Sequence, residues 1–410
     1  MPYSNRRTVH AYLLWACLLV VASGVLSSSG CGGGVASVSD QSRGAVQSVQ
    51  LAAAYSKLLV QQALQELGLT ITAPGFSGIR LYRVIYWTVD VQGNPTTASG
   101  MIAYPQGVSG PRPLLSYQHG TEVEKTEVPS NPSNEEMLAV SFGLTSAGYI
   151  VVAADYLGLG ESTGLHPYLH ADSEASACLD MLRAAVTVTA QRNVQLSDKL
   201  FLAGYSQGGH ATMALHRALE QTASSEFTVT ASAPMAGPYD LSGTTFAMAL
   251  TDPSESSSLY AAYLLVAYDA IYDVYSSPSE AFVAPVDAIV ESLFDGYHTT
   301  DQIKAALPAT PQEMLRPEYL AAVTTNPDHP LNVALRANDL YDWLPIAPVR
   351  LFHGGADKTV PFANSQVAYD HMSALGADIE LINVGADLNH STAVMPCFLA
   401  AKQWLDSFLE

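Results

Sequence analysis

Basic residues are scarce in this sequence. The 410-residue chain carries 18 Lys and Arg residues against 38 Asp and Glu residues, which gives a formal net charge of −20. Such an acidic chain repels phosphate backbones, so the composition argues against a nucleic-acid partner. Only 14% of the residues are charged and 48% are apolar. The chain can therefore bury a large core, in one domain with an insertion or in two smaller domains.

Cysteine is also rare, with four residues in the whole chain. Cys17 lies in a predicted export signal and Cys31 at its predicted cleavage site, which leaves Cys178 and Cys397. Two cysteines cannot supply the disulfide framework on which many small secreted folds depend. Each of the two lies in a helical apolar pattern, where an unpaired buried thiol is more usual than a bridge.

The apolar run near the N-terminus is too short to span a membrane. At about 1.5 Å per residue, Ala11–Leu26 extends over roughly 24 Å, whereas the hydrocarbon core of a bilayer is ~30 Å thick. We therefore interpret residues 1–30 as a signal peptide. The segment Ser28-Ser29-Gly30-Cys31 resembles a bacterial lipoprotein cleavage site, although Ser28 stands where Leu is usual. Cys31 is thus the expected lipidated first residue, and ordinary signal-peptidase cleavage nearby is the alternative.

These features predict a secreted or cell-envelope protein, an outer-membrane or periplasmic lipoprotein of a bacterium with a membrane attachment through Cys31. Residues 32–43 are small, polar and aperiodic, as in a flexible tether. Residues 45–67 show helical apolar spacing that ends at Gly68. We expect the folded body to begin with this helix.

The pattern after residue 80 is that of an α/β fold. Two β-like runs, 81–90 and 98–105, flank the turn residues Gln92-Gly93-Asn94-Pro95 and predict an antiparallel hairpin. Further on, strands that are apolar on both faces alternate with helices, which indicates a mostly parallel sheet covered by helices on both faces. The strand-like runs are 113–120, 149–156, 199–206, 227–237, 348–355 and 379–385, and the helical ones are 135–147, 172–190, 209–222, 362–375 and 391–408.

This alternation stops for about a hundred residues, which are helical and rich in Ala, Tyr and Ser. We interpret residues 241–345 as a helical cap inserted between two parts of the core, 44–240 and 346–410. A separate small domain is the alternative, but no linker-like stretch flanks the segment. Its tyrosines lie at helical spacing and either line an apolar pocket or pack the cap onto the core.

One segment has the organisation of a nucleophile elbow. A strand stops, Gly204-Tyr205-Ser206-Gln207-Gly208 turns sharply, and a helix follows at once. Strand and helix approach each other closely at such a turn, which requires Gly204 and Gly208 to lack side chains. The helix N-terminus directs free amides and its positive dipole end toward developing negative charge. Ser206 is therefore the predicted nucleophile, and a tight turn that serves only packing is the alternative.

The same five-residue pattern occurs a second time, as Gly160-Glu161-Ser162-Thr163-Gly164. Here the preceding strand has already ended near Tyr156, and the following Leu165-His166-Pro167 cannot begin a helix cleanly. We interpret Ser162 as a turn residue in a surface loop.

A serine hydroxyl becomes nucleophilic when a neutral imidazole accepts its proton and a carboxylate orients that imidazole. The strand-like run 348–355 turns into Asp357, and the run 379–385 turns into His390, so both lie at the carboxyl edge of the sheet. Helix capping is the alternative role for each. Asp240 is the alternative acid because it follows the preceding strand. Asp387 is too near His390 on the same loop to reach the far ring nitrogen.

Acyl transfer also needs two amide donors where the carbonyl oxygen becomes negative. The elbow supplies the amide of Gln207, and the loop His119-Gly120-Thr121 offers the amide of Thr121. A plain glycine turn is the alternative interpretation of that loop.

No metal or other cofactor is expected. His166 and His170 are four residues apart, but metal ligands at that spacing need a helix and a third ligand, and Pro167 argues against the helix. We interpret the two as a hydrogen-bonded loop pair near the pocket. His210 is expected to pack, and His353 to support the turn that carries Asp357.

From about residue 80 to its end the chain resembles α/β-hydrolases of the secretory-lipase and bacterial carboxylesterase kind. The resemblance is carried by TVDVQGNPTTASGMIAYP, SYQHGT, GYIVVAADYLGLGES, FLAGYSQGG, ASAPMAGPYDL and the turns of Asp357 and His390. It implies hydrolysis of carboxylic esters of small molecules or lipids by a triad of Ser206, Asp357 and His390. It also implies that no metal takes part and that a helical cap, inserted between the sixth and seventh core strands, shapes the acyl site.

The sequence of the cap departs from that resemblance, so the substrate stays open. The same triad serves peptidases and acyltransferases, because the pocket decides between them. A non-catalytic surface-binding module is the alternative outside catalysis.

Overall fold

The computed structural model describes residues 41–409. The predicted signal peptide, Cys31 and most of the predicted tether lie outside these residues. Arg43, at the end of that tether, donates from Nε to the Asp180 carboxylate at 3.0 Å, so the chain is bound to the folded body from this point. Among the described residues, no helix combines the length and the apolar character that a membrane crossing requires.

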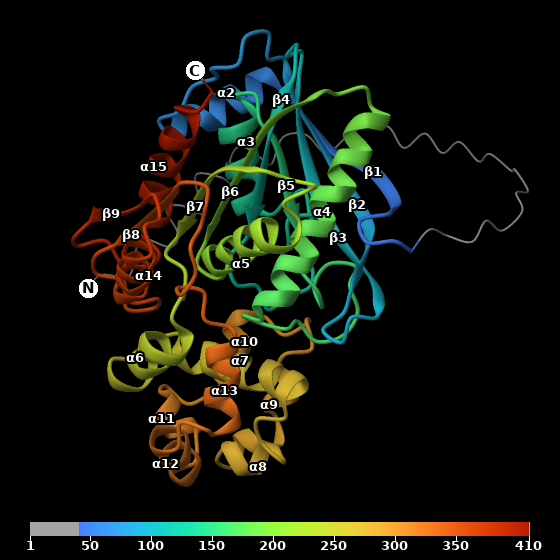
Figure 1. The fold of residues 1–410 in the computed structure, drawn as a ribbon. Helices are drawn as coiled ribbons and strands as arrows, with labels where there is room; N and C mark the ends of the chain where they lie inside the picture. Colours follow the sequence, from blue (N-terminus) through green and yellow to red (C-terminus); the bar gives the residue numbers. More distant parts are fainter. Residues whose placement is uncertain (1–40, 410) are drawn as a thin grey trace, which may run out of the picture.

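One sheet of nine strands runs through the described part of the molecule (Figure 1). Its spatial order is β1-β2-β3-β5-β4-β6-β7-β8-β9. The pairs from β1 to β5 are antiparallel, and all later pairs are parallel. The predicted mostly parallel sheet is confirmed. The strands are β1 (Val46–Ser56), β2 (Gly78–Val89), β3 (Pro95–Gln106), β4 (Arg112–Gln118), β5 (Ile150–Ala154), β6 (Leu196–Tyr205), β7 (Val229–Met235), β8 (Val349–Gly354) and β9 (Ile379–Gly385).

Helices cover both faces of this sheet, as the apolar pattern of its strands predicts. On β6, Phe201 and Tyr205 pack toward α2, α3 and α15, whereas Leu200 and Leu202 pack toward α4 and α5. Helix α14 packs on β8 and β9, on the same face as α5. The bounds are α2 (Lys57–Glu66), α3 (Glu135–Thr145), α4 (Ala171–Gln191), α5 (Gln207–Thr222), α14 (Ala363–Ala374) and α15 (Val394–Asp406).

The predicted hairpin is confirmed. Strands β2 and β3 pair in register from Gly78 opposite Gln106 to Val89 opposite Pro95. The Asp90 carboxylate closes the turn between them by accepting from turn backbone amides, as Asp does in such turns.

The predicted helix over residues 45–67 is wrong in its first half, because residues Val46–Ser56 form strand β1 and only α2 is helical. The segment is rich in Ala, Gln and Leu, which favour helices. Strand β1 instead pairs antiparallel with β2 and thereby satisfies the main-chain groups at the edge of that strand. A tertiary contact outweighed the local propensity.

A helical insertion, which we call the cap, lies between β7 and β8 and occupies one end of the molecule (Figure 1). It has its own apolar cluster. Two of its tyrosines pack against the core rather than line a pocket: Tyr263 donates to Glu122 O at 3.3 Å and Tyr268 to Leu169 O at 2.9 Å. The elements are η1 (Leu241–Thr245), α6 (Phe246–Thr251), α7 (Ser257–Tyr272), α8 (Pro278–Ala281), η2 (Val286–Ala288), α9 (Val290–Leu293), α10 (Thr300–Ala306), α11 (Pro311–Met314), α12 (Pro317–Thr325) and α13 (Pro330–Ala337).

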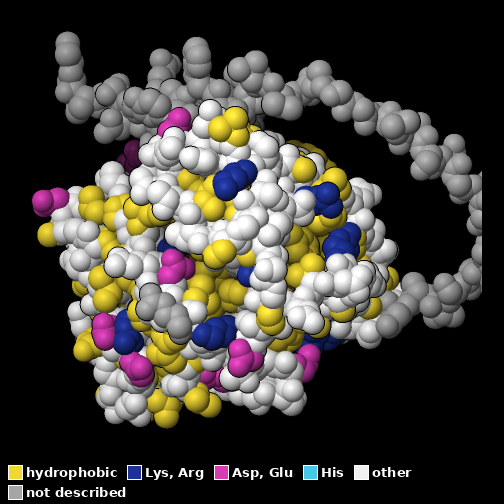
Figure 2. All heavy atoms as spheres, turned by 90° about the horizontal axis from the view of Figure 1, so that it is seen from above, with side chains coloured by type: hydrophobic (Ala, Val, Ile, Leu, Met, Phe, Trp, Pro, Cys, Tyr) yellow, Lys and Arg dark blue, Asp and Glu magenta, His cyan; other side chains and the backbone are white. Residues whose placement is uncertain are grey.

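The expectation for the two remaining cysteines can be compared with the described residues. Cys178 in α4 and Cys397 in α15 are both buried and unpaired, as predicted. On the face of the molecule opposite the cap, basic and acidic side chains are interspersed and form no patch of one sign (Figure 2).

Candidate active site

Ser206 occupies the turn between the end of β6 and the start of α5. Its backbone has φ 61° and ψ −123°, a conformation that is strained for a residue with a side chain and that is found at functional sites. A Cβ on Gly204 would lie 2.4 Å from Gly208 O, and one on Gly208 would lie 2.0 Å from Gln118 O. These contacts are far below van der Waals distance, so the close packing of strand and helix requires both glycines.

The structure brings Ser206, His390 and Asp357 together from three separate loops. Ser206 Oγ lies 2.8 Å from His390 Nε2, and His390 Nδ1 lies 2.6 Å from Asp357 Oδ2. The side chain of His390 is 15% exposed, whereas that of Asp357 is fully buried. The ring therefore connects the serine to a buried carboxylate, and its Nδ1–H donates to Asp357 while Nε2 accepts from Ser206.

Asp357 is held in its charged form. Its Oδ1 accepts from the amides of Thr359 and Val360, both at 2.9 Å. Burial raises the pKa of Asp357, but hydrogen bonds from His353 and His390 outweigh burial and lower this pKa to about 2. His353 Nε2 lies 3.3 Å from Asp357 Oδ2, so His353 contacts the acid turn, where the sequence predicted it to act as a support.

Main-chain bonds fix the loops of the acid and the histidine to each other. The amide of Gly355 donates to Gly385 O at 2.9 Å, and that of Ala356 donates to Leu388 O at 3.0 Å. From the elbow, the Tyr205 hydroxyl donates to the backbone oxygen of His390 at 2.6 Å. The positions of the three side chains therefore depend on strands β6, β8 and β9 together.

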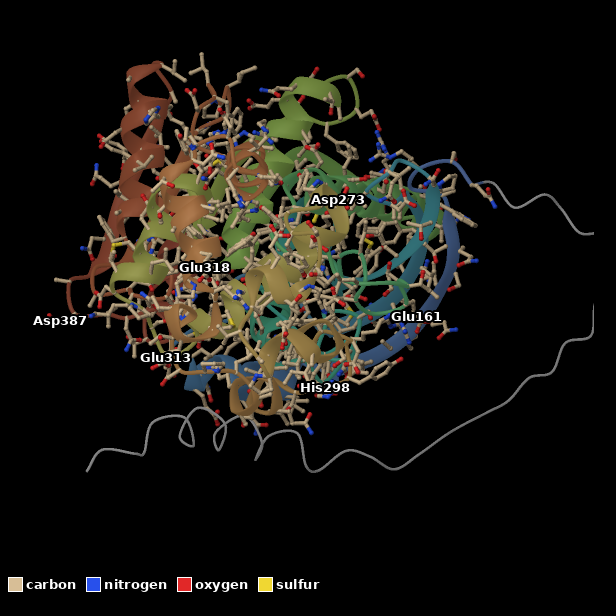
Figure 3. All side chains as sticks on the ribbon, turned by 90° about the horizontal axis from the view of Figure 1, so that it is seen from below. Glu161, Asp273, His298, Glu313, Glu318 and Asp387 are labelled. Atoms are coloured by element: carbon tan, nitrogen blue, oxygen red, sulfur yellow. The ribbon has the colours of Figure 1, made fainter. Side chains whose placement is uncertain are left out.

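The two alternative acids differ from Asp357 in their surroundings. Asp240 accepts from the amides of Gly243 and Thr244 at 2.9 and 2.8 Å and so caps η1. Asp387 is exposed and points outward at the edge of the molecule (Figure 3).

The second copy of the elbow pattern has another structure. Ser162 lies in a loop without a following helix, and its amide donates to Leu159 O at 3.0 Å. The prediction of a turn residue holds, but its placement at the surface is wrong, because Ser162 is 1% exposed. Its backbone oxygen accepts from Lys125 Nζ at 2.5 Å.

The predicted oxyanion donors lie on two segments that pack together. Strand β4 lies between β5 and β6, which makes its carboxyl end the switch point where ligands bind in α/β sheets. A Cβ on Gly120, just after β4, would lie 3.7 Å from Tyr205 O of the elbow. Among residues 41–409, the backbone amides of Gln207 and Thr121 donate to no protein acceptor, so both are free to bind an anion.

A pocket leads from Ser206 into the cap. Ser206 and Gln207 form its floor. Its walls are mainly apolar. They come from η1, α6, α7, α11 and α13 of the cap and from residues outside the cap that include Tyr168, Pro238 and Val360. The residues of α6 and α7 are Phe246, Ala249, Leu250, Ser257, Tyr260, Ala261, Leu264 and Leu265. Of the five cap tyrosines 260, 263, 268, 272 and 275, Tyr260 alone lines this pocket.

Several residues around the elbow have roles that were not predicted from the sequence. A Cβ on Gly209 would lie 2.5 Å from Met235 O, so this position, like the two predicted glycines, excludes a side chain. His210 was expected only to pack, but its Nδ1 lies 2.7 Å from Glu174 Oε2. Two features of the sequence could have indicated these roles: the pair Gly208-Gly209, and the carboxylate of Glu174 within an apolar helical pattern.

The two histidines at 166 and 170 bind different partners. His166 Nε2 faces the side-chain amide of Gln207 at 2.8 Å, and His170 Nδ1 caps α4 by accepting from Ser173 N at 3.3 Å. Within residues 41–409, no group of three or more His, Cys, Asp and Glu side chains is arranged to hold a metal ion.

The sheet topology, the elbow and the cap define an α/β-hydrolase. The family model described as secretory lipase matches residues 125–235, from the loop after β4 to the end of β7. The rice cell wall degrading esterase LipA from Xanthomonas oryzae is 32% identical, with a TM-score of 0.80 over 89% of this chain and 97% of that one. The chain belongs to the secretory lipase family.

Other solved structures share the fold. A Legionella pneumophila protein is 30% identical, with a TM-score of 0.83 over 88% of this chain and 98% of that one. Candida antarctica lipase A shares the fold, with a TM-score of 0.67 over 89% of this chain and 83% of that one, at 17% identity. A search of curated proteins finds no match.

Proposed function

We propose that this protein hydrolyses carboxylic esters through an acyl-enzyme formed on Ser206. The observation that carries the proposal is the continuous hydrogen-bonded path from Ser206 Oγ through His390 to Asp357, with distances of 2.8 and 2.6 Å. The esterase and lipase relatives support a carboxylic ester as the substrate class.

In the first step Ser206 Oγ attacks the ester carbonyl while His390 Nε2 takes the serine proton. The buried, ionised Asp357 stabilises the imidazolium that forms. The amides of Gln207 and Thr121 donate to the oxygen that becomes negative. His390 then gives its proton to the leaving alkoxide, and the alcohol departs from the acyl-enzyme.

In the second step water enters the site of the departed alcohol. His390 takes a proton from this water, whose oxygen attacks the acyl carbon, and the same two amides hold the second oxyanion. Collapse returns the proton to Ser206 Oγ and releases the carboxylic acid.

The pocket between Ser206 and the cap fits the acyl chain of the substrate. Apolar side chains of α6 and α7 line it. An alkyl chain that binds there removes its apolar surface from water, which favours binding by about 25 cal/mol per Å². A peptide would have to leave its polar groups unpaired against these walls, which disfavours a peptidase.

A p-nitrophenyl ester series from acetate to palmitate, with a peptide amide as the control, tests this function. We expect hydrolysis of the esters, and a higher kcat/KM for chains that fill the pocket than for acetate. Cleavage of the peptide amide without ester hydrolysis would contradict the proposal.

Ser206→Ala should lower kcat by about 10³- to 10⁶-fold, because the nucleophile is lost while the fold is retained. The comparison is made at equal concentrations of protein with an unchanged melting temperature. Ser162→Ala is the matched variant at the second pattern, and we expect it to keep kcat.

We also propose export and lipid attachment at Cys31. Labelling of producing cells with an alkyne fatty acid should mark the wild-type protein and leave Cys31→Ser unmarked. Equal labelling of both would overturn the attachment site without affecting the proposed chemistry.

A further inference from the structure

Gln207 has a buried side chain as well as the backbone amide that faces the site. The residue is 1% exposed and directly follows Ser206. Its Nε2 lies 2.8 Å from His166 Nε2 and 2.9 Å from Glu174 Oε1. Both N–H bonds of the amide are therefore used, and a rotated amide would place its oxygen against the Glu174 carboxylate. The side chain has one favourable orientation.

The partners of Gln207 are themselves fixed. His166 Nδ1 donates to a backbone carbonyl at 2.8 Å, which leaves Nε2 as the acceptor for Gln207. Glu174 Oε2 is paired with His210 Nδ1 at 2.7 Å, and His210 Nε2 donates to Asn338 O at 3.0 Å. The side chains of His166, Glu174 and His210 are at most 2% exposed. Loss of any of these bonds would leave a buried polar group unpaired, so the network is stiff.

His166 belongs to the chain segment 156–170, which also contacts the loop that carries the amide of Thr121. Tyr156 donates to His119 O at 3.1 Å, and the rings of these two residues stack with centroids 4.2 Å apart. The hydroxyls of Tyr168 and Thr121 lie 3.1 Å apart and share a hydrogen bond. Both donor segments thus rest on residues 156–170, one through the hydrogen bond between His166 and the Gln207 side chain and one through two tyrosines.

We propose that residues 156–170 and Glu174 form an oxyanion brace, which sets the two amide donors and acts on the elbow through the side chain of Gln207. His166 and Glu174 are positioning residues in this brace. Oxyanion donors work at 2.7–3.1 Å from the developing charge, so small displacements of the Gln207 peptide weaken them. The inference rests on the proposed function, because it concerns a charge that forms only in acyl transfer.

Gln207→Met tests the brace, because methionine keeps the side-chain length and the backbone amide but forms neither hydrogen bond. We expect kcat per titrated active site to fall about 10- to 100-fold, somewhat less than the loss of a whole donor. KM for p-nitrophenyl butyrate should stay within about 2-fold, because the donors act on the transition state. Affinity for an alkyl trifluoromethyl ketone, whose adduct with Ser206 carries an oxyanion, should fall by the same factor as kcat.

Two substitutions of Glu174 separate hydrogen bonding from packing. Glu174→Gln retains an acceptor oxygen for Gln207 and should keep nearly the wild-type kcat. Glu174→Leu has no such acceptor and should behave like Gln207→Met. Equal kcat in the two Glu174 variants would overturn the proposal.

His216→Met is the matched control on the same helix. His216 is fully buried, and its Nε2 lies 2.9 Å from Glu220 Oε1. His216→Met therefore removes the buried partner of Glu220, as Gln207→Met removes a buried partner of Glu174. We expect lower thermal stability with unchanged kcat and ketone affinity. If Gln207→Met changes kcat and ketone affinity no more than His216→Met does, the brace is wrong.

If Gln207→Met fails to fold, Tyr168→Phe removes a single hydroxyl from the other half of the brace. We expect a fall of about 3- to 10-fold in kcat, the effect of one hydrogen bond, and an unchanged kcat would overturn the brace. Active-site titration with a fluorophosphonate separates the two hypotheses. A wild-type enzyme that neither reacts nor hydrolyses esters contradicts the proposed function, whereas an active wild type with unaffected variants contradicts the brace alone.

Discussion

Asp357 and Asp240 follow neighbouring strands of the sheet, yet their carboxylates have different environments. Asp357 receives hydrogen bonds from two histidines and two amides, whereas Asp240 accepts from the first amides of η1. The sequence predicted Asp357 because it stands where a strand ends and a glycine turn begins. Asp240 has the same kind of position in the sequence. The two carboxylates are distinguished only by the groups that they contact in the structure.

Asp357→Asn should lower kcat by about 10³- to 10⁴-fold, because the amide no longer stabilises the imidazolium or selects its tautomer. Steady-state kinetics with p-nitrophenyl butyrate measures this. Asp240→Ala is the control: it should keep kcat within a few-fold and lower the free energy of unfolding by about 1 kcal/mol through the lost cap. A reversed pattern would make Asp240 the acid.

The low pKa of Asp357 also makes the free energy of unfolding depend on pH. Its pKa is about 2 in the folded protein against a usual value of 3.8, so the ionised form stabilises the fold above pH ~4, and this contribution is lost as pH falls toward 2. The difference in unfolding free energy between wild type and Asp357→Asn should shrink over that interval. Urea unfolding at pH 5, 4 and 3 would contradict the assignment if the difference stayed constant.

At the scale of elements, residue type alone was a poor guide where pairing or burial decides. Strand β1 has a helix-like composition but pairs with β2, a contact that local propensity does not contain. Glu174 looks like one polar residue on a helical face, and its burial follows from the packing of α4 on α5. Strands and helices around Ser206, Asp357 and His390 were predicted because each strand is continuous, apolar and closed by a turn.

The loop after β4 should show a pH-dependent stability. Burial is the main cause that lowers the pKa of His119 to about 4, and the nearby His166 lowers it in the same direction. Because the unfolded chain binds this proton below pH ~6.5 and the folded one does not, the free energy of unfolding falls by up to about 3 kcal/mol as pH drops from 6.5 to 4. His119→Asn should show a shallower fall in urea unfolding. An equal slope in both proteins would contradict this.

For the whole molecule, the sequence predicted an α/β core interrupted by a helical insertion but did not reveal how the insertion meets the core. The tyrosine spacing left two roles open, and the structure divides them: Tyr263 and Tyr268 pack, while Tyr260 lines the pocket. Such a division depends on how α7 is oriented on the core, which side-chain spacing does not encode.

The cap should set the preference for acyl-chain length. Ala261→Trp places an indole in the pocket and should lower kcat/KM for the octanoate ester about 10-fold or more while changing that for acetate only slightly. Ala270→Trp, at an exposed position of the same helix α7 outside this pocket, is the control and should change neither. Equal losses for acetate and octanoate in Ala261→Trp would place the acyl chain elsewhere.

The location of the activated serine tests the proposed chemistry directly. The purified protein is treated with a fluorophosphonate, digested, and the modified peptide is sequenced by mass spectrometry. We expect a single adduct on Ser206, and none in Ser206→Ala. An adduct on Ser162, or no adduct on the folded wild-type protein, would contradict it.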